Sequence, residues 1–130
     1  MKFGYTIVYV QDVTQSVSFY EQAFDLKRKF IHESNQYAEM STGDTTLAFA
    51  AHSLGKTNLP TGFSTKQTSK TITAIEIAFI TKDVKVAYDR ALSAGAIGVS
   101  SPTVKPWGQT VAYLQDLDGT LIEIASPIEE

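Results

Sequence analysis

The predicted order of strands and helices occurs twice along this chain. Asp12-Val13 begins one amphipathic helix, and Asp83-Val84 begins a second, 71 residues later. Two turn-forming segments, Gly43-Asp44-Thr45 and Asp118-Gly119-Thr120, stand 75 residues apart. Copies of an internal repeat usually share one fold. The sequence therefore predicts an α+β protein of two βαβββ modules, whose curved sheets enclose a cavity.

The expected elements follow from apolar periodicity and from helix-capping residues. The predicted strands are 5–10, 26–34, 37–42, 45–52, 73–81, 96–100, 109–115 and 120–126, with a further extended stretch near Lys105, and the predicted helices are 13–25 and 84–94. Residues 53–71 are rich in Ser, Thr, Gly, Lys and Pro and show no apolar period, which indicates a long surface loop. We expect one domain, 1–130, with modules 1–52 and 72–130 joined by this loop.

Composition excludes several classes of function. A net charge of −3 and a single short basic cluster, Lys27-Arg28-Lys29, are unlike a nucleic-acid-binding surface. The chain has no cysteine, which removes disulfides, thiolate metal sites and cysteine nucleophiles. No apolar run approaches the ~18 residues of a membrane span, and the N-terminus does not resemble a signal peptide. We expect a cytoplasmic protein that binds neither nucleic acid nor a membrane.

Strand alternation gives each predicted strand one bulky apolar face and one face of small residues. Glu76 and Glu123 fall on the small-residue face, which is otherwise rich in alanine. Buried carboxylates are unfavourable unless they are paired or hydrogen-bonded. We expect the two glutamates to face each other across the cavity, with the pKa of at least one raised. The alternative is that this face is simply solvated.

Two stretches resemble the vicinal oxygen chelate superfamily, which includes glyoxalase I, bleomycin-resistance proteins and extradiol dioxygenases. YTIVYVQDVTQSVSFYEQAFDL is similar to the opening of its first module, and PWGQTVAYLQDLDGTLIEIASP to the closing hairpin of its second. The resemblance covers nearly the whole chain apart from 53–71. It implies the paired-module fold, but the superfamily supports unrelated chemistries on one scaffold.

Metal-dependent members take one ligand from each of four strands, and the resemblance places these positions at Tyr5, Ala48, Glu76 and Glu123. Only Glu123 matches the usual ligand type, and Ala48 has no ligating atom. Catalytic metal sites generally use three protein ligands, so no metal cofactor is expected. A divalent ion held by Glu39, Glu76 and Glu123 is the alternative, because a two-residue turn at Gly43-Asp44 would place Glu39 opposite Ala48.

Aromatic residues and a few polar groups in a concavity are typical of a small-molecule site. The candidate ligand-binding residues are Tyr5, Tyr9, Glu39, Ala48, His52, Glu76, Trp107, Tyr113 and Glu123. For Glu39 and His52 the alternative is a solvated position, and for Trp107 a core position. The predicted function is binding of a small organic molecule, as in bleomycin-resistance proteins, by a homodimer. The alternatives are a metal-dependent glyoxalase-type lyase or isomerase, with Glu39, Glu76 and Glu123 as candidate catalytic residues, and a dimerising scaffold with a vestigial pocket.

Overall fold

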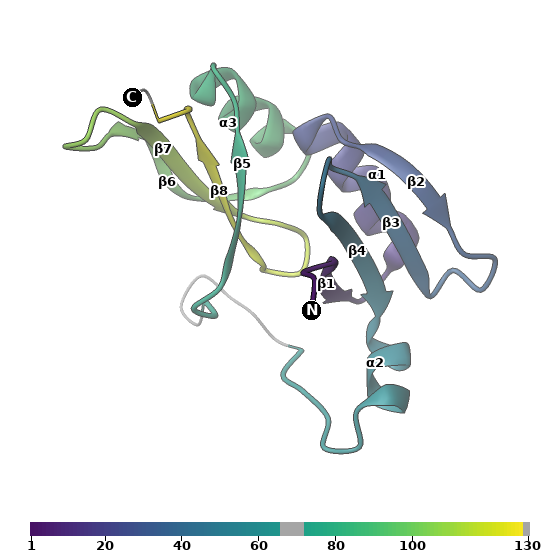
Figure 1. Ribbon diagram of the computed structural model, residues 1–130. Coiled ribbons are helices and arrows are strands. Elements are labelled where there is room, and N and C mark those ends of the chain that lie inside the picture. The colour runs from purple at the N-terminus through teal and green to yellow at the C-terminus, as the bar shows by residue number, and fades with distance from the viewer. Residues whose placement is uncertain (66–71, 129–130) are drawn as a thin grey trace. The chain divides into compact units, whose positions relative to one another are not determined.

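The computed structural model describes residues 1–65 and 72–128. The chain divides into two compact units, Met1–Thr65 and Lys66–Glu130. Figure 1 shows that each unit contains one four-stranded sheet and a helix packed on it. The predicted α+β class and the two βαβββ modules are confirmed.

The first unit begins with β1 (Tyr5–Val10), α1 (Val13–Phe24) and β2 (Lys27–Ile31). It continues with β3 (Tyr37–Ser41), β4 (Thr46–Ala51) and α2 (His52–Asn58). The sheet order is β1-β4-β3-β2, with β1 parallel to β4 and the other neighbours antiparallel. A parallel pair needs a crossover connection, and α1 lies within that connection.

The core of the first unit lies between α1 and one face of the sheet. Val17 and Tyr20 of α1 are buried, and the Tyr20 ring lies 4.7 Å from that of Phe49 on β4, measured between ring centroids. Asp12 begins the helix as predicted, because its carboxylate accepts a hydrogen bond of 3.0 Å from the Gln15 N–H. Asp25 ends the helix in a left-handed conformation, with φ of 56°.

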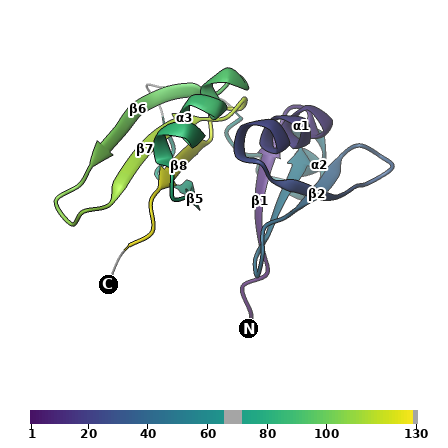
Figure 2. The ribbon, with the colours of Figure 1, turned by 90° about the horizontal axis from the view of Figure 1, so that it is seen from above.

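The second unit repeats this plan with β5 (Glu76–Ile80), α3 (Val84–Ser93) and β6 (Ile97–Val104). It ends with β7 (Thr110–Gln115) and β8 (Leu121–Ala125), in the sheet order β5-β8-β7-β6. Asp83 caps α3 by accepting a bond of 3.1 Å from the Val86 N–H. Figure 2 shows α3 lying along this sheet, where it packs against β6, β7 and β8.

The largest differences between the expected elements and the structure are in two segments. The predicted loop 53–71 contains α2 over its first part, and residues 66–71 lie outside the described residues. Packing rather than periodicity stabilises α2: Gly55 is buried, and a Cβ there would come within 2.6 Å of the Phe63 ring and 2.8 Å of the Tyr9 ring. The strand predicted at 26–34 ends at Ile31, because residues 32–35 form a turn in which Asn35 has a positive φ of 58°.

No helix in residues 1–65 or 72–128 is long and apolar enough to span a membrane.

Candidate functional site

Each sheet has a helix face, which packs against α1 or α3, and an opposite face that we call the open face. In the first unit, Ala38 and Met40 of β3 are buried on the helix face, and strand alternation places Tyr37 and Glu39 on the open face. In the second unit, exposure alternates along β5, where Glu76, Ala78 and Ile80 are the exposed residues. The predicted division of strand faces is therefore confirmed in both units.

Glu39 is the polar centre of the first unit's open face. It pairs with Ala48 across β3 and β4, as the two-residue turn predicted. Its carboxylate accepts a hydrogen bond of 2.9 Å from the Tyr37 hydroxyl, and Lys29 Nζ lies 3.6 Å from its other oxygen. Burial, followed by the hydrogen bond to Glu39, raises the pKa of Tyr37 to about 12. Glu39 is 9% exposed, so this carboxylate is buried, hydrogen-bonded and charge-paired.

The register that pairs Lys27 with Ser41 and Arg28 with Met40 continues to Lys29 opposite Glu39. It then shifts, so that Phe30 is the residue paired with Glu39. Such a bulge re-aims the side chains of the bulged strand. The Phe30 ring then lies near that of Tyr37, with centroids 6.1 Å apart. The irregularity thus adds one aromatic ring beside the cation that the register already places opposite Glu39.

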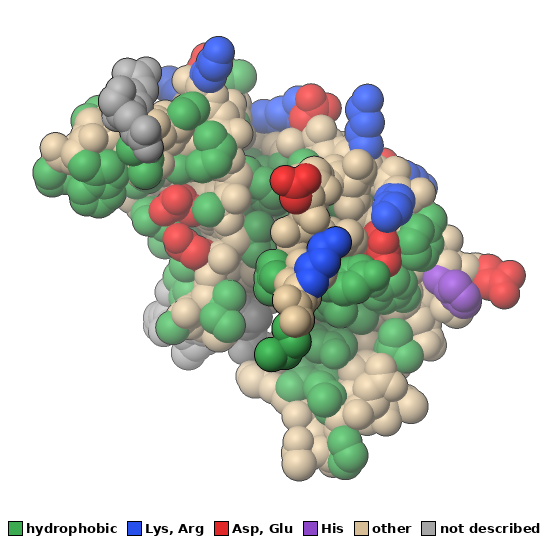
Figure 3. Space-filling view, in the orientation of Figure 1, with side chains coloured by type: hydrophobic (Ala, Val, Ile, Leu, Met, Phe, Trp, Pro, Cys, Tyr) green, Lys and Arg blue, Asp and Glu red, His purple; other side chains and the backbone are tan. Residues whose placement is uncertain are grey.

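The corresponding group in the second unit is formed by Tyr113 and Glu123, which pair directly across β7 and β8. The Tyr113 hydroxyl donates a hydrogen bond of 2.7 Å to the Glu123 carboxylate. Glu123 also neighbours Ala78 on β5, so Glu76 lies two residues away along the adjacent parallel strand. Figure 3 shows acidic side chains among hydrophobic ones over this sheet.

The expectation that Glu76 and Glu123 face each other across a cavity is wrong. Both glutamates lie in the second unit, on neighbouring strands of one sheet. The expected direction of the pKa shift is nevertheless found, since burial and then the charge of Glu123 raise the pKa of Glu76 above 4.5. The hydrogen bond to Glu123, followed by burial, raises the pKa of Tyr113 to about 12.

No lysine, arginine or histidine within the described ranges forms an ion pair with Glu76 or Glu123. Within the part of the chain that the structure describes, the second open face therefore carries two neighbouring carboxylates without an ion-pair partner, whereas Lys29 balances Glu39 in the first.

The remaining candidate residues lie in three places. Tyr5 is exposed on β1 and Ala48 is fully buried on β4. Tyr9 and His52 both contact Phe63, with ring centroids 4.8 and 5.9 Å apart; His52 is the first residue of α2 and not a strand residue as predicted. Trp107 is exposed in the turn between β6 and β7, so the alternative of a core position is wrong.

The superfamily implies a divalent metal, and the residues of each unit do not fit one. Among residues 1–65 and 72–128, no three His, Cys, Asp or Glu side chains come together as a metal-binding group. The lysine beside Glu39 already supplies the positive charge that a bound cation would provide there. Glu76 and Glu123 supply only two carboxylates, and catalytic sites generally use three protein ligands.

The sequence reasoning missed the hydrogen-bond and ion-pair partners of Glu39. Tyr37 could have been found, because residues two apart on a strand share a face. Lys29 was missed because residues 32–34 were predicted as strand, whereas they belong to the turn that sets the β2–β3 register. Phe63, which covers Tyr9, falls in a segment without periodicity and had no signal.

Comparisons with known proteins agree with this architecture. A family model described as a glyoxalase-like domain matches residues 3–129. No curated protein matches the chain. Solved structures do match it, at identities that show the fold alone.

A glyoxalase-related enzyme from Fulvimarina pelagi has a TM-score of 0.85 and 17% identity, over 97% of this chain and 88% of that one. A glyoxalase/bleomycin resistance protein/dioxygenase family enzyme from Burkholderia phytofirmans has a TM-score of 0.81 and 20% identity, over 97% and 98%. TioX from Micromonospora has a TM-score of 0.71 and 20% identity, over 97% and 98%.

Proposed function

The chain belongs to the glyoxalase-like domain family of the vicinal oxygen chelate superfamily, and from this premise we propose that it binds a small organic molecule on the open faces of its sheets. In the first unit the proposed polar contacts are Glu39 and His52 and the apolar walls are Tyr5 and Tyr9. In the second unit the proposed polar contacts are Glu76 and Glu123 and the apolar walls are Trp107 and Tyr113. Ala48 is fully buried and is not among the proposed contacts. The mode of binding is that of a bleomycin-resistance-type protein rather than of a metal-dependent lyase.

The observation that carries this proposal is the pair of carboxylates in the second unit. Glu123 is held in place by the Tyr113 hydroxyl at 2.7 Å, and Glu76 adds a second negative charge on the neighbouring strand. Two carboxylates close together disfavour each other's charged form. A ligand with a basic or hydrogen-bond-donating group would relieve this repulsion, and the proposed ligand therefore carries such a group.

The adjoining surface suits an organic molecule. Ala78 lies beside Glu123 on β5, and an alanine side chain leaves room above the sheet. Tyr113 contributes an aromatic ring whose hydroxyl is already hydrogen-bonded to Glu123, so its orientation is held before any ligand arrives. Preorganised groups of this kind lower the entropic cost of binding.

The direct test is a thermal-shift titration with bleomycin and with a panel of aromatic amines, each beside its neutral analogue. A ligand that binds only the native state stabilises it by RT ln(1 + [L]/Kd). We expect basic compounds to raise Tm and their neutral analogues to raise it less. Failure of every compound to raise Tm would favour the scaffold alternative.

The Glu123→Gln variant tests the site itself. It should keep its fold or gain stability, because it removes one of two repelling charges, and it should weaken ligand binding. Glu33→Gln is the matched control, since Glu33 is an exposed glutamate of the first unit. A Tm several degrees lower for Glu123→Gln at pH 7 to 8 would show that the carboxylate is structural and that the site assignment is wrong.

Elemental analysis separates this proposal from the metal-dependent alternative. We expect no stoichiometric zinc, nickel, manganese or iron in protein purified at neutral pH. About one divalent ion per chain would contradict the proposal and favour a lyase or isomerase that uses Glu39, Glu76 and Glu123.

We further propose that the protein is a homodimer, because modules of this superfamily commonly pair edge to edge. Light scattering should give twice the 14.2 kDa mass of one chain. A mass of one chain at micromolar concentration would contradict this.

A further inference from the structure

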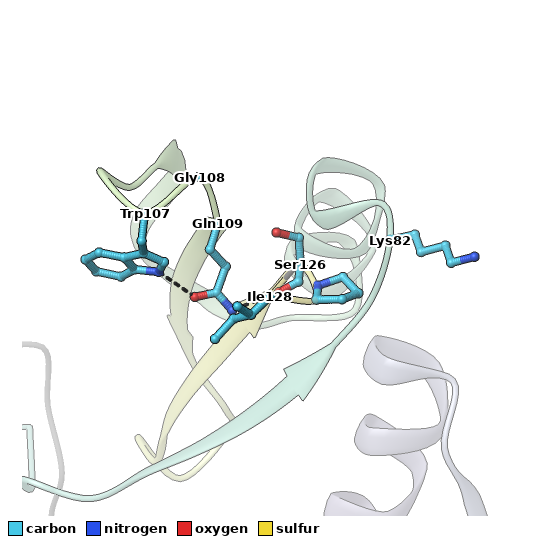
Figure 4. A pocket seen from close by; sticks show the side chains of 7 residues that line it. Lys82, Trp107, Gly108, Gln109, Ser126 and Ile128 are labelled. Atoms are coloured by element: carbon cyan, nitrogen blue, oxygen red, sulfur yellow. Dashed lines mark hydrogen bonds between the residues drawn. The ribbon is translucent and has the colours of Figure 1, made fainter. Parts of the chain in front are cut away.

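The two units differ in whether a proposed aromatic contact is free to meet a ligand. In the second unit, Trp107 lines a pocket of about 710 Å³ and is 64% exposed, with its indole Nε1–H hydrogen-bonded to Gln109 at 2.9 Å (Figure 4). In the first unit, the Tyr9 ring is covered by that of Phe63, with ring centroids 4.8 Å apart. A side chain of the protein itself therefore occupies the space beside Tyr9.

Tyr9 belongs to the open face of the first sheet. It alternates along β1 with Val8, and Val8 neighbours Phe49, which packs against α1 on the helix face. The short helix α2 begins directly after β4 and contacts both β1 and β4 (Figure 1). Phe63 and α2 thus cover part of the face on which we place the ligand.

Phe63 fills a slot lined by Tyr9, His52 and Gly55. Its ring centroid lies 5.9 Å from that of His52. Gly55 lies against both Phe63 and Tyr9, because a Cβ there would come within 2.6 Å of the first ring and 2.8 Å of the second. The absence of a side chain at this buried glycine makes room for the Phe63 ring. Aromatic rings at these separations attract each other beyond simple burial, so the slot suits one flat aromatic ring.

Phe63 belongs to residues 59–65, which we call the strap. Phe63 is half-buried, and the other residues of the strap are exposed. Two backbone hydrogen bonds lie within α2 and the strap, from the Leu59 N–H to the Gly55 carbonyl at 2.9 Å and from the Gly62 N–H to the Leu59 carbonyl at 3.0 Å. A segment with few buried contacts opens at a low cost in free energy. Phe63 is therefore the main apolar contact that holds the strap on the open face.

We propose that the slot between Tyr9 and His52 is a subsite for an aromatic ring of the ligand, and that Phe63 occupies it until such a ring displaces the strap. This inference rests on the function proposed above, because Tyr9 and His52 are two of its contacts. The ring of the ligand meets the same two side chains, so it replaces the contacts that Phe63 gives up. A saturated ring has similar volume without the stacking and replaces them less well.

Benzylamine and cyclohexylmethylamine test the subsite, because they share a charge and differ in the ring. The chain has two histidines, so NMR can follow the His52 ring signals with His32 as the internal reference. Benzylamine should shift the His52 signals saturably and should remove the nuclear Overhauser effect between Phe63 and Tyr9. Cyclohexylmethylamine should bind there severalfold more weakly. Equal affinities, or saturation with the Phe63–Tyr9 contact intact, would overturn the proposal.

Phe63→Ala empties the slot and keeps its walls. The apparent dissociation constant is the intrinsic one divided by the fraction of protein in which the slot is open. Phe63→Ala should therefore bind benzylamine at least about tenfold more tightly, the factor expected if the strap is closed about nine-tenths of the time. Gly55→Ala also expels Phe63 but narrows the slot with its own Cβ, so it should bind no more tightly than the wild type. Leu59→Ala is the matched control, because it shortens an exposed apolar residue of the same strap, and it should leave the affinity unchanged.

The outcomes separate this inference from the proposed function. Affinity at His52 that is unchanged or weaker in Phe63→Ala would overturn the strap and leave the proposed function standing. The absence of any His52 shift in both proteins would overturn the subsite. An increase in Tm with benzylamine would then show that the proposed function holds at other contacts, and no increase would show that both are wrong.

Discussion

Both units place a carboxylate–tyrosine pair on the open face of a sheet, and the surroundings of the two pairs are electrostatically opposite. In the first unit Glu39 is buried and lies 3.6 Å from the Lys29 ammonium. In the second unit Glu123 has Glu76 as its charged neighbour. The charge of Glu39 therefore stabilises its surroundings, whereas the charge of Glu123 is opposed by a like charge.

The two pairs also differ in where the carboxylate originates. Glu39 lies on β3 and faces Ala48 on β4, whereas Glu123 lies on β8 and faces Tyr113 on β7. β3 and β7 hold equivalent positions in the two sheets, as do β4 and β8. The carboxylate therefore comes from the third strand of the first unit and from the fourth strand of the second. A duplicated fold can therefore keep a polar centre on the same face of the sheet while a different strand supplies its carboxylate. One centre has a lysine beside its carboxylate, and the other has a second carboxylate as its charged neighbour.

The largest expected difference between the units is in stability after truncation. Glu39→Ala should lower the free energy of unfolding by about 2 kcal/mol, because it leaves the part-buried Tyr37 hydroxyl unpaired. Glu123→Ala should cost less, because removing a charge that Glu76 repels offsets the lost hydrogen bond. Urea denaturation measures both values, and equal losses would show that the two centres are not electrostatically different.

Tyrosine titration sharpens the comparison. Burial is the leading cause of the raised pKa of Tyr37, whereas the hydrogen bond to Glu123 leads for Tyr113. Glu123→Gln should therefore lower the pKa of Tyr113 from about 12 by more than Glu39→Gln lowers that of Tyr37. Ultraviolet difference spectra at alkaline pH, with Tyr37→Phe and Tyr113→Phe for assignment, measure both.

The same two tyrosines predict how stability depends on alkaline pH. Their protonated forms are favoured in the native state, so the native state binds more protons than the unfolded state above pH 10. Stability should fall as pH rises from the unfolded pKa of 10.0 toward about 12. Tyr37→Phe and Tyr113→Phe should each make this fall less steep. An unchanged alkaline slope in both variants would contradict the assignment.

Removing only the charge of each glutamate should have a smaller effect on stability, with opposite signs in the two units. Glu39→Gln should destabilise the protein and Glu123→Gln should stabilise it. Each effect should be less than ~1 kcal/mol, because Lys29, the charge partner of Glu39, is exposed to solvent and Glu123 is only part-buried. The stabilisation by Glu123→Gln should grow as pH rises above 4.5, the ordinary pKa of Glu76. Above that pH Glu76 loses its proton in the native state, and the repulsion that the substitution removes becomes larger. Melting curves from pH 4 to 8 measure this, and effects of the same sign would refute the comparison.

The smallest expected effect belongs to Lys29→Gln. The Lys29 side chain is 59% exposed, so its pair with Glu39 should contribute no more than ~0.5 kcal/mol and should lose most of that at high salt. Denaturation at low and high salt checks this. A loss that persists at 1 M salt would show that Lys29 stabilises the unit through packing of its apolar stem rather than through its charge.

The pairing of Glu39 with Ala48 shows how much of the site local sequence could predict. The turn at Gly43-Asp44 sets the register between β3 and β4, and a two-residue turn permits one pairing only. Alternation then places Glu39 on the open face, and Tyr37 with it. Strand faces and turns are decided by neighbours in the chain, and for this reason those predictions are confirmed.

Glu76 and Glu123 show where the same reasoning failed. Their faces were predicted correctly, but their relation was not, because β5 pairs with β8 across a long stretch of chain. Which strands become neighbours depends on the path of the chain between them, and no local pattern encodes that path.

Local sequence was enough to predict the repeat, the capped helices and the composition of each strand face. These depend on residue spacing and on hydrogen bonds within a few residues, such as those from Asp12 and Asp83 to their helices. Which distant groups meet depends on the tertiary structure. Lys29 lies opposite Glu39 through the β2–β3 register, Phe63 contacts Tyr9 and lies against Gly55, and Gln109, which accepts from Trp107, donates to Ser126 after β8. Such contacts depend on the free energy of packing distant segments together, which periodicity does not contain.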